Sequence, residues 1–187
     1  MKRLVIAATG ASGAIYLQRL LNYLGREKCE IHLLFSDYGR QVVREEVGEL
    51  SLPDNVHQYN SRSMNAPFVS GSTRFDAMVV CPCSMGTLAR IAAGTSDTAI
   101  LRAADVFLKE RRRLILVPRE TPFNLIHARN LVSVLEAGAD VIPAMPSFYS
   151  LPTTLEAAAD TVVWRIVQHL GFQVEEAFRW QEQLETE

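Results

Sequence analysis

Five short segments of the chain are almost continuously apolar, and each is followed by a stretch of helical periodicity or by a loop leading into one. The apolar segments span residues 3–8, 30–35, 76–81, 113–117 and 140–143. Strands that are covered on both faces have this continuous apolar character, whereas half-exposed strands alternate between apolar and polar residues. The pattern therefore predicts five buried strands of a parallel sheet.

Between and after these strands, apolar residues recur every three or four positions, which is typical of helices packed on one side. Helices are predicted over residues 14–24, 38–47, 85–93, 103–110, 123–137 and 155–170. The repeated strand–helix order predicts the α/β fold class, a three-layer Rossmann-like or flavodoxin-like domain with a parallel sheet and right-handed crossovers. Because no linker or internal repeat interrupts this order, we expect a single domain over residues 1–187.

Two regions depart from the pattern. Residues 52–75 are rich in proline, asparagine, serine and glycine and lack periodicity, and a loop of that length in a compact domain is usually functional or a lid. The tail, residues 172–187, is polar but contains Phe178 and Trp180. We expect this tail to dock on a neighbouring subunit.

Composition narrows the possible partners. The 187 residues are 48% hydrophobic and 21% charged, with a net charge of -2, which is typical of a globular protein and gives no reason to expect nucleic acid or membrane as a partner. No apolar run reaches the roughly 18 residues of a membrane span, and the apolar run near the amino terminus is shorter than that of a signal peptide. The three cysteines cannot all pair, so a reduced, cytoplasmic chain is expected.

Candidate binding residues follow the predicted strands, at the sheet edge where open α/β folds bind ligands. After the first strand comes Thr9-Gly10-Ala11-Ser12-Gly13-Ala14, a glycine-bearing turn at a helix amino terminus. Such a turn presents free N–H groups to an anion, but it also serves as a tight structural turn, with Ser12 as a cap. It is neither a dinucleotide nor a triphosphate motif.

The next two turns offer further polar groups. Ser36 follows the second strand, where a cap of the following helix is the alternative role. Ser84 and Thr87 follow the third strand, in a turn that is interpreted as a second hydrogen-bonding loop on the same sheet edge. The third strand ends in Cys81-Pro82-Cys83, but zinc sites need three or four ligands and no histidine is near. The sequence therefore predicts no metal.

The fourth strand ends in Arg119-Glu120, a fork of donors for phosphate beside a carboxylate that can accept or return a proton. A surface ion pair is the alternative. Arg102 and Lys109 lie seven residues apart and so share a helix face, which would aim two cations at one anion. Tyr149 is expected at the same sheet edge.

Four segments together resemble the flavin prenyltransferases, the UbiX-like family formerly described as aromatic acid decarboxylases. They read TGASGA, CPCSMGTLA, RAADVFLKERRRLILVPRETP and PSFY, in this order, and the resemblance covers almost the whole chain. It implies transfer of a dimethylallyl group from dimethylallyl monophosphate to reduced FMN, without metal. It further implies a homo-oligomer, a dodecamer in the family, whose product serves a UbiD-type decarboxylase.

The resemblance also implies residue roles. The positions that match FMN contacts are Gly10, Ala11, Ser12, Ser36, Ser84, Met85, Gly86, Thr87 and Arg119. Those that match contacts to the prenyl phosphate are Lys109, Arg119, Glu120, Tyr149 and Arg165. The catalytic positions are Ser12, Glu46 and Glu120 for proton handling and Lys109 for the phosphate, with Glu45 as an alternative to Glu46. Lys109 and Glu120 are expected to act from another subunit.

One position departs from some relatives, which carry a tryptophan in the middle loop where this chain has Met64. Since an aromatic face stabilises a cation better than a thioether does, the accepted prenyl donor is expected to differ. Two other functions fit the same fold. They are an FMN-dependent cysteine decarboxylase, which would need a histidine base, and a non-catalytic flavin carrier or decarboxylase subunit.

Overall fold

A computed structural model of the chain describes residues 1–177 and contains a six-stranded sheet. The strands are β1 (Lys2–Ala8), β2 (Cys29–Phe35), β3 (Val56–Asn60), β4 (Ala77–Cys83), β5 (Arg113–Pro118) and β6 (Asp140–Val141). Their order across the sheet is β3-β2-β1-β4-β5-β6, and every neighbouring pair is parallel. The predicted α/β fold with a parallel sheet is confirmed.

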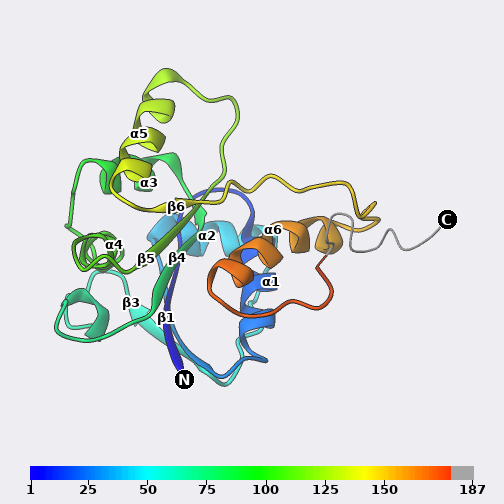
Figure 1. The fold of residues 1–187 in the computed structure, drawn as a ribbon, viewed down its shortest axis with the longest axis horizontal. Coiled ribbons are helices and arrows are strands. Elements are labelled where there is room, and N and C mark those ends of the chain that lie inside the picture. The colour runs from blue at the N-terminus through cyan, green and yellow to red at the C-terminus, as the bar shows by residue number, and fades with distance from the viewer. Residues whose placement is uncertain (178–187) are drawn as a thin grey trace.

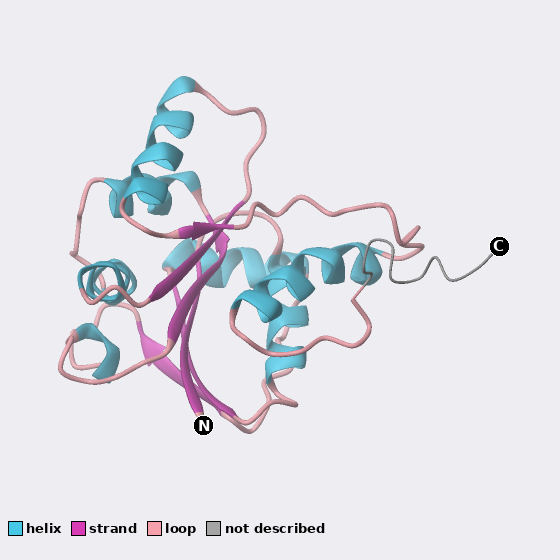
Figure 2. Ribbon diagram, viewed as in Figure 1, coloured by secondary structure: helices cyan, strands magenta, loops and turns pink. Residues whose placement is uncertain are grey.

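Helices cover both faces of this sheet (Figures 1 and 2). They are α1 (Ala14–Leu24), α2 (Asp37–Glu46), η1 (Pro67–Val69), α3 (Met85–Ala92), α4 (Ala99–Lys109), α5 (Leu125–Glu136) and α6 (Leu155–His169). Apolar residues of α1, α2 and α6 pack on one face, and those of η1, α3, α4 and α5 pack on the other. The sheet is therefore the middle of three layers.

The strand sequences explain these two cores. In β1, Leu4 and Ile6 face the α1–α6 side while Val5 and Ala7 face the α3–α4 side, and all four are fully buried. Successive side chains of a strand point to opposite faces, so a strand that is buried on both sides must be apolar throughout. This is why β1 showed no alternation in the sequence.

The region predicted to be an irregular loop, residues 52–75, contains a strand and a short helix. β3 pairs with β2 at the edge of the sheet, and η1 packs beneath it through the buried ring of Phe68. β3 escaped the prediction because an edge strand needs no continuous apolar run, and His57 and Gln58 are exposed to solvent. The loop prediction was wrong for these residues.

Several predicted boundaries also move. Helix α4 begins at Ala99 rather than at residue 103, because the Thr98 side chain caps it by accepting a hydrogen bond from the Leu101 N–H. Helix α5 begins at Leu125 after its cap Asn124, and β6 is only two residues long. Polar capping residues set these starts, and periodicity alone does not locate them.

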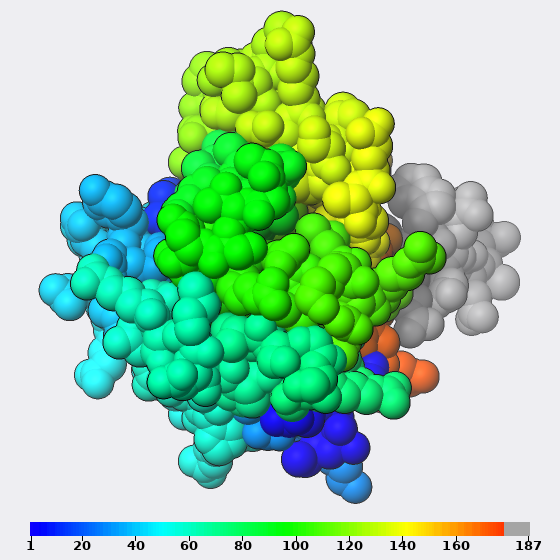
Figure 3. All heavy atoms as spheres, turned by 90° about the vertical axis from the view of Figure 1, so that its left-hand side faces the viewer, coloured from blue at the N-terminus to red at the C-terminus, as the bar shows by residue number. Residues whose placement is uncertain are grey.

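Helix α5 projects from the body of the molecule, as the view onto the α3–α4 side shows (Figure 3). Its apolar residues Leu125, Ile126, Val132 and Leu135 are all more than half exposed. The residues of the tail expected to dock on a neighbour, Phe178 and Trp180, lie outside the described residues. Within residues 1–177, no helix is long and apolar enough to span a membrane.

Candidate functional site

The loops that follow β1, β2, β4 and β5 meet at the carboxyl edge of the sheet, where the sequence placed the candidate residues. Backbone hydrogen bonds connect the loops. The Ser36 N–H donates to Ala8 O at 2.9 Å, and the Arg119 N–H donates to Cys83 O at 3.2 Å. Because these bonds join neighbouring strand ends, Ser12, Ser36, Ser84 and Arg119 lie along one edge.

Glu46, the last residue of α2, holds the loop between β1 and α1 by hydrogen bonds. Its Oε2 accepts hydrogen bonds from the N–H groups of Gly13 and Ala14, both at 2.8 Å, and its carboxylate also bonds the Ser12 side chain. These amides stand at the amino terminus of α1, where the helix dipole favours an anion. The anion at this helix terminus is therefore a side chain of the chain itself.

This arrangement separates the two adjacent glutamates. Glu45 points elsewhere and accepts a hydrogen bond from Gln41 at 2.8 Å, whereas Glu46 reaches the α1 loop. Partial burial opposes the charge on Glu46, but the bonds from Ser12, Gly13 and Ala14 and the nearby positive charge of Arg119 outweigh it. The pKa of Glu46 is consequently below its ordinary value, and the group is a carboxylate at neutral pH.

The charge of Arg119 reaches two residues near the α1 loop. Its charge acts on Glu46 and on Tyr16, a half-buried tyrosine in the first turn of α1. Burial and the neighbouring Cys81 raise the pKa of Tyr16, while the Arg119 charge lowers it by a smaller amount. Arg119 itself is exposed at the end of β5. The structure thus brings Ser12, Glu46 and Arg119 together.

The sequence did not single out Thr9, although this residue holds two of the loops in register. Its buried hydroxyl donates to Pro82 O at 3.0 Å and accepts from the Ser84 N–H at 2.8 Å. The bonds fix the start of the α1 loop to the start of the α3 loop. In the sequence, the signal for this role was a threonine that directly follows an apolar strand.

The amino terminus of α3 is open to a ligand. The Ser84 hydroxyl caps the helix by accepting from the Thr87 N–H at 3.2 Å and donates to the Thr87 hydroxyl at 3.0 Å. A Cβ atom built on Gly86 would meet no heavy atom within 4 Å. Free N–H groups, a helix dipole and open space are the conditions for binding a phosphate.

The α2 loop is closely packed by contrast. The Ser36 side chain caps α2 by accepting from the Gly39 N–H at 2.9 Å. A Cβ on Gly39 would approach Ala8 O to 2.4 Å, and one on Gly10 would approach the Tyr38 Cβ to 2.5 Å. Glycine is therefore required at both positions so that the α1 and α2 loops can pack against each other.

Glu120 is exposed beside Arg119, and its Oε1 accepts a hydrogen bond from the N–H of Thr121 at 2.9 Å. It makes no ion pair with Arg119, so the alternative of a surface ion pair between these two residues is not what the structure shows in the described part of the chain. The carboxylate is thus available at the edge of the sheet.

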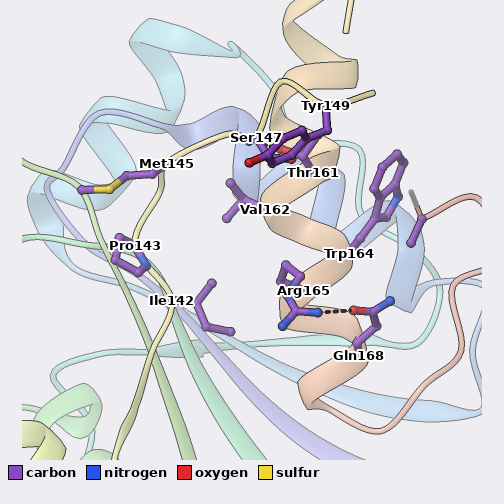
Figure 4. A pocket seen from close by; sticks show the side chains of 11 residues that line it. Ile142, Pro143, Met145, Ser147, Tyr149, Thr161, Val162, Trp164, Arg165 and Gln168 are labelled. Carbon is purple, nitrogen blue, oxygen red and sulfur yellow. Dashed lines mark hydrogen bonds between the residues drawn. The ribbon is translucent and has the colours of Figure 1, made fainter. Parts of the chain in front are cut away.

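Tyr149 and Arg165 line a hollow of about 640 Å³ between α6 and the segment that follows β6 (Figure 4). This segment starts at the same sheet edge, because the Ala144 N–H donates to Pro118 O at 3.0 Å. Arg165 donates to Gln168 Oε1 at 3.1 Å. Ser12, Glu46 and Arg119 do not line this hollow, so one chain presents two separate halves of the expected site.

Lys109 lies at the opposite edge of the sheet, four residues before β5 begins, while Arg119 directly follows the end of β5. Lys109 pairs with Glu110, and Arg102 pairs with Asp105 and donates to Val69 O. Each of these cations therefore has an acidic partner within the chain, and the expectation that Arg102 and Lys109 aim at one anion stays a prediction. Met64 is 43% exposed in the loop after β3.

Comparisons with known proteins point to one family. The family described as Flavoprotein matches residues 1–169. A flavin prenyltransferase UbiX from Pseudomonas aeruginosa is 40% identical over 200 aligned positions, covering 97% of this chain and 95% of the relative. The probable UbiX-like flavin prenyltransferase of Bacillus subtilis is 40% identical, covering 95% of this chain and 89% of the relative.

Solved structures give the same result. A dodecameric FMN-dependent UbiX-like decarboxylase from Escherichia coli O157:H7 superposes with a TM-score of 0.91 at 38% identity, covering 96% of this chain and 99% of that one. AnUbiX (PadA1), in complex with FMN and dimethylallyl pyrophosphate, gives a TM-score of 0.90 at 41% identity, covering 96% and 97%.

The parallel sheet, the glycine-bearing loops at its carboxyl edge and the matched family define a flavoprotein of the α/β class. Within this class, the chain is about 40% identical to the UbiX-like relatives of P. aeruginosa and B. subtilis, over most of the length of each protein. The chain belongs to the UbiX-like flavin prenyltransferase family.

Proposed function

We propose that this protein transfers a dimethylallyl group from dimethylallyl monophosphate to reduced FMN, giving prenylated FMN for a UbiD-type decarboxylase. The observation that supports it most is the Glu46 carboxylate bonded to Ser12 beside Arg119, in a chain of this family. The identity of about 40% favours this activity over a cysteine decarboxylase or a non-catalytic flavin carrier.

The flavin phosphate fits the amino terminus of α3 better than that of α1. Glu46 already occupies the α1 amides, whereas the space around Gly86 is open. We assign FMN binding to Gly10, Ala11, Ser12, Ser36, Ser84, Met85, Gly86, Thr87 and Arg119. When bound, reduced FMN supplies the nucleophilic ring nitrogen N5 and the neighbouring ring carbon that accept the prenyl group.

Ser12 and Glu46 form a path for a proton. The Ser12 hydroxyl is bonded to a carboxylate that is ionised at neutral pH, so Glu46 can take a proton through Ser12 from a group bound above the α1 loop. The hydrogen bonds from Ser12, Gly13 and Ala14, with a smaller contribution from the charge of Arg119, keep Glu46 in its charged form. Glu120 is proposed as the second proton carrier, acting at the phosphate oxygens.

Cations neutralise the leaving phosphate. When the bond between the allylic carbon and the phosphate oxygen breaks, negative charge grows on the phosphate, and charged donors stabilise it. Tyr149 and Arg165 supply donors from the hollow beside α6. Lys109 lies at the opposite sheet edge in its own chain, so we propose that it reaches the site, together with Glu120, from another subunit.

A homo-oligomer follows from this division of the site, and the exposed apolar side of α5 offers a surface for it. The E. coli neighbour is described as dodecameric, and we propose the same assembly here. We further propose one domain over residues 1–187 and a cytoplasmic location. The buried, unpaired thiols of Cys29, Cys81 and Cys83 fit a reducing compartment.

An anaerobic transfer assay tests the proposal. The purified protein, incubated with reduced FMN and dimethylallyl monophosphate without added metal, is expected to yield a flavin that is heavier by one five-carbon prenyl group. Dimethylallyl pyrophosphate serves as a parallel donor. Unchanged flavin mass with both donors contradicts the proposal, and full activity of Glu120→Gln removes the role assigned to that residue.

A further inference from the structure

The segment between β6 and α6 carries Tyr149 but has no regular secondary structure of its own. Backbone bonds hold its first residues to β5, from the Ile142 N–H to Leu116 O at 2.9 Å and from the Ala144 N–H to Pro118 O at 3.0 Å. Tyr149 follows five residues later and is 70% exposed. Between these bonds and Tyr149, the segment makes a further contact with α6.

Thr161 of α6 supplies a fixed point. Its hydroxyl accepts a hydrogen bond from the Ser147 N–H at 3.0 Å and donates one to Ala158 O at 2.7 Å. The residue is 8% exposed. Because both the donor and the acceptor of the hydroxyl are used, its orientation is set, and it holds the segment against the helix.

The position of Thr161 connects the two residues that face the expected donor phosphate. Thr161 and Arg165 are four residues apart, so they lie on the same face of α6, and both line the hollow. Ser147, which Thr161 holds, comes two residues before Tyr149. Figure 4 shows Ser147, Thr161 and Tyr149 grouped at one end of the hollow, with Arg165 further along the helix.

The bond to Ser147 is not needed by the helix. A threonine in a helix commonly donates to a carbonyl one turn back, as Thr161 does to Ala158. That local bond leaves the oxygen free to accept, and here it accepts from another segment. A valine, like Val162 and Val163 next to it, would fill the same buried volume and suit the apolar surroundings better.

We propose that Thr161 is a positioning residue that sets the distance between Tyr149 and Arg165 and thereby the affinity for the prenyl phosphate. This inference rests on the proposed function, which assigns Tyr149 and Arg165 to the donor. It predicts a specific pattern, in which the loss of the hydroxyl weakens the binding of the donor but not that of the flavin.

The test compares Thr161→Val, which keeps the shape and removes the hydroxyl, with Thr161→Ser, which keeps the hydroxyl. The Kd of dimethylallyl monophosphate is measured on the protein loaded with oxidised FMN, which does not turn over, and KM and kcat are measured with reduced FMN. Thr161→Val is expected to raise Kd and KM about three- to tenfold, the loss of one hydrogen bond. The kcat at saturating donor is expected to fall as well, because the same donors stabilise the charge that grows on the leaving phosphate. The Kd of FMN is expected to stay unchanged, and Thr161→Ser to bind like wild type.

Thr9→Val is the matched control, because Thr9 is also a buried threonine whose hydroxyl both donates and accepts. It is expected to weaken FMN and spare the donor. Donor binding by Thr161→Val that equals wild type overturns the inference, as does an equal loss of FMN and donor affinity. Wild-type protein that binds the donor but makes no product contradicts the proposed function alone, and wild type that does not bind the donor contradicts both.

Discussion

At the residue scale, Glu46 and Gly86 show how this edge of the sheet divides its two helix termini. Both α1 and α3 begin at loops that could receive an anion, but a glutamate side chain fills the first and open space surrounds the second. This difference supports the proposal that the first terminus handles a proton and the second binds a phosphate.

Replacing Glu46 with glutamine tests the first assignment. The pKa of Glu46 is lower in the folded chain than its ordinary value of 4.5, so its stabilising contribution is complete above about pH 4.5 and is lost as the pH falls through the lowered pKa. We expect Glu46→Gln to cost about 0.5 kcal/mol of unfolding free energy at pH 7 and nothing in strong acid. Urea unfolding at several pH values measures this difference.

Glu45→Gln is the matched control for that measurement, because Glu45 contacts Gln41 instead of the α1 amides. It is expected to leave the pH dependence of wild type in place. A Glu46→Gln profile that runs parallel to wild type through the acid range would mean that the contact with α1 carries no charge-dependent stability.

Replacing Gly86 with alanine tests the second assignment and separates folding from binding. The added methyl meets no protein atom and a helical alanine is favoured over glycine, so the free energy of unfolding without flavin is expected to rise by about 0.5–1 kcal/mol. The same methyl would stand where the flavin phosphate approaches, and FMN affinity is expected to fall at least about tenfold, or 1.4 kcal/mol. Thermal unfolding and flavin titration give the two values, and unchanged FMN affinity contradicts the phosphate site.

At the scale of elements, the sequence predicted the strands that are apolar runs and missed the strand that is held by hydrogen-bond pairing at the sheet edge. The buried strands β1, β2, β4 and β5 were predicted because both faces of each are covered. β3 was missed because pairing with β2 holds it at the edge while its side chains stay polar. The sequence placed candidate residues in the turns before α1 and α3 and after β5. The contact between Glu46 and Ser12, which are 34 positions apart, depends on the fold and has no local signal.

The bridge that Thr9 makes between the ends of β1 and β4 belongs to this scale. Thr9→Val leaves the Ser84 N–H without its acceptor, and an unpaired buried amide costs about 1–3 kcal/mol. We expect that loss in chemical denaturation and a rise in the Kd of FMN, because the α1 and α3 loops lose two of the bonds that join them, while the backbone bond from the Thr9 N–H to Pro82 O remains. Thr9→Ser keeps the hydroxyl and is expected to retain wild-type affinity. A Thr9→Val protein that is destabilised but binds FMN normally would limit Thr9 to a structural role.

At the scale of the whole molecule, the residues of the proposed site lie at two opposite edges of the sheet in one chain. Ser12, Glu46 and Arg119 lie at the carboxyl edge of the sheet, and Lys109 lies at the amino edge, beyond the length of β5. Helix α5 follows the carboxyl end of β5 in the sequence, and the apolar residues on its outer side are exposed. Both features fit the proposal that subunits complete one another's sites.

Mixed assemblies test that division. Lys109→Gln and Arg119→Gln are each expected to be inactive alone, because every site lacks one group. Co-expressed subunits of the two variants are expected to recover roughly a quarter of wild-type transfer, since random assembly of a symmetric oligomer restores that share of the sites. The anaerobic flavin mass assay measures it. Co-purified assemblies that stay inactive would place Lys109 and Arg119 in separate roles.

The contact between Glu46 and the start of α1 has a kinetic consequence. The loop from Gly10 to Ala14 is already held by three hydrogen bonds before any ligand arrives, so it has little conformational entropy left to lose on binding. Association with flavin should then occur in one step, at a rate set by diffusion and orientation, without a slow phase of loop ordering.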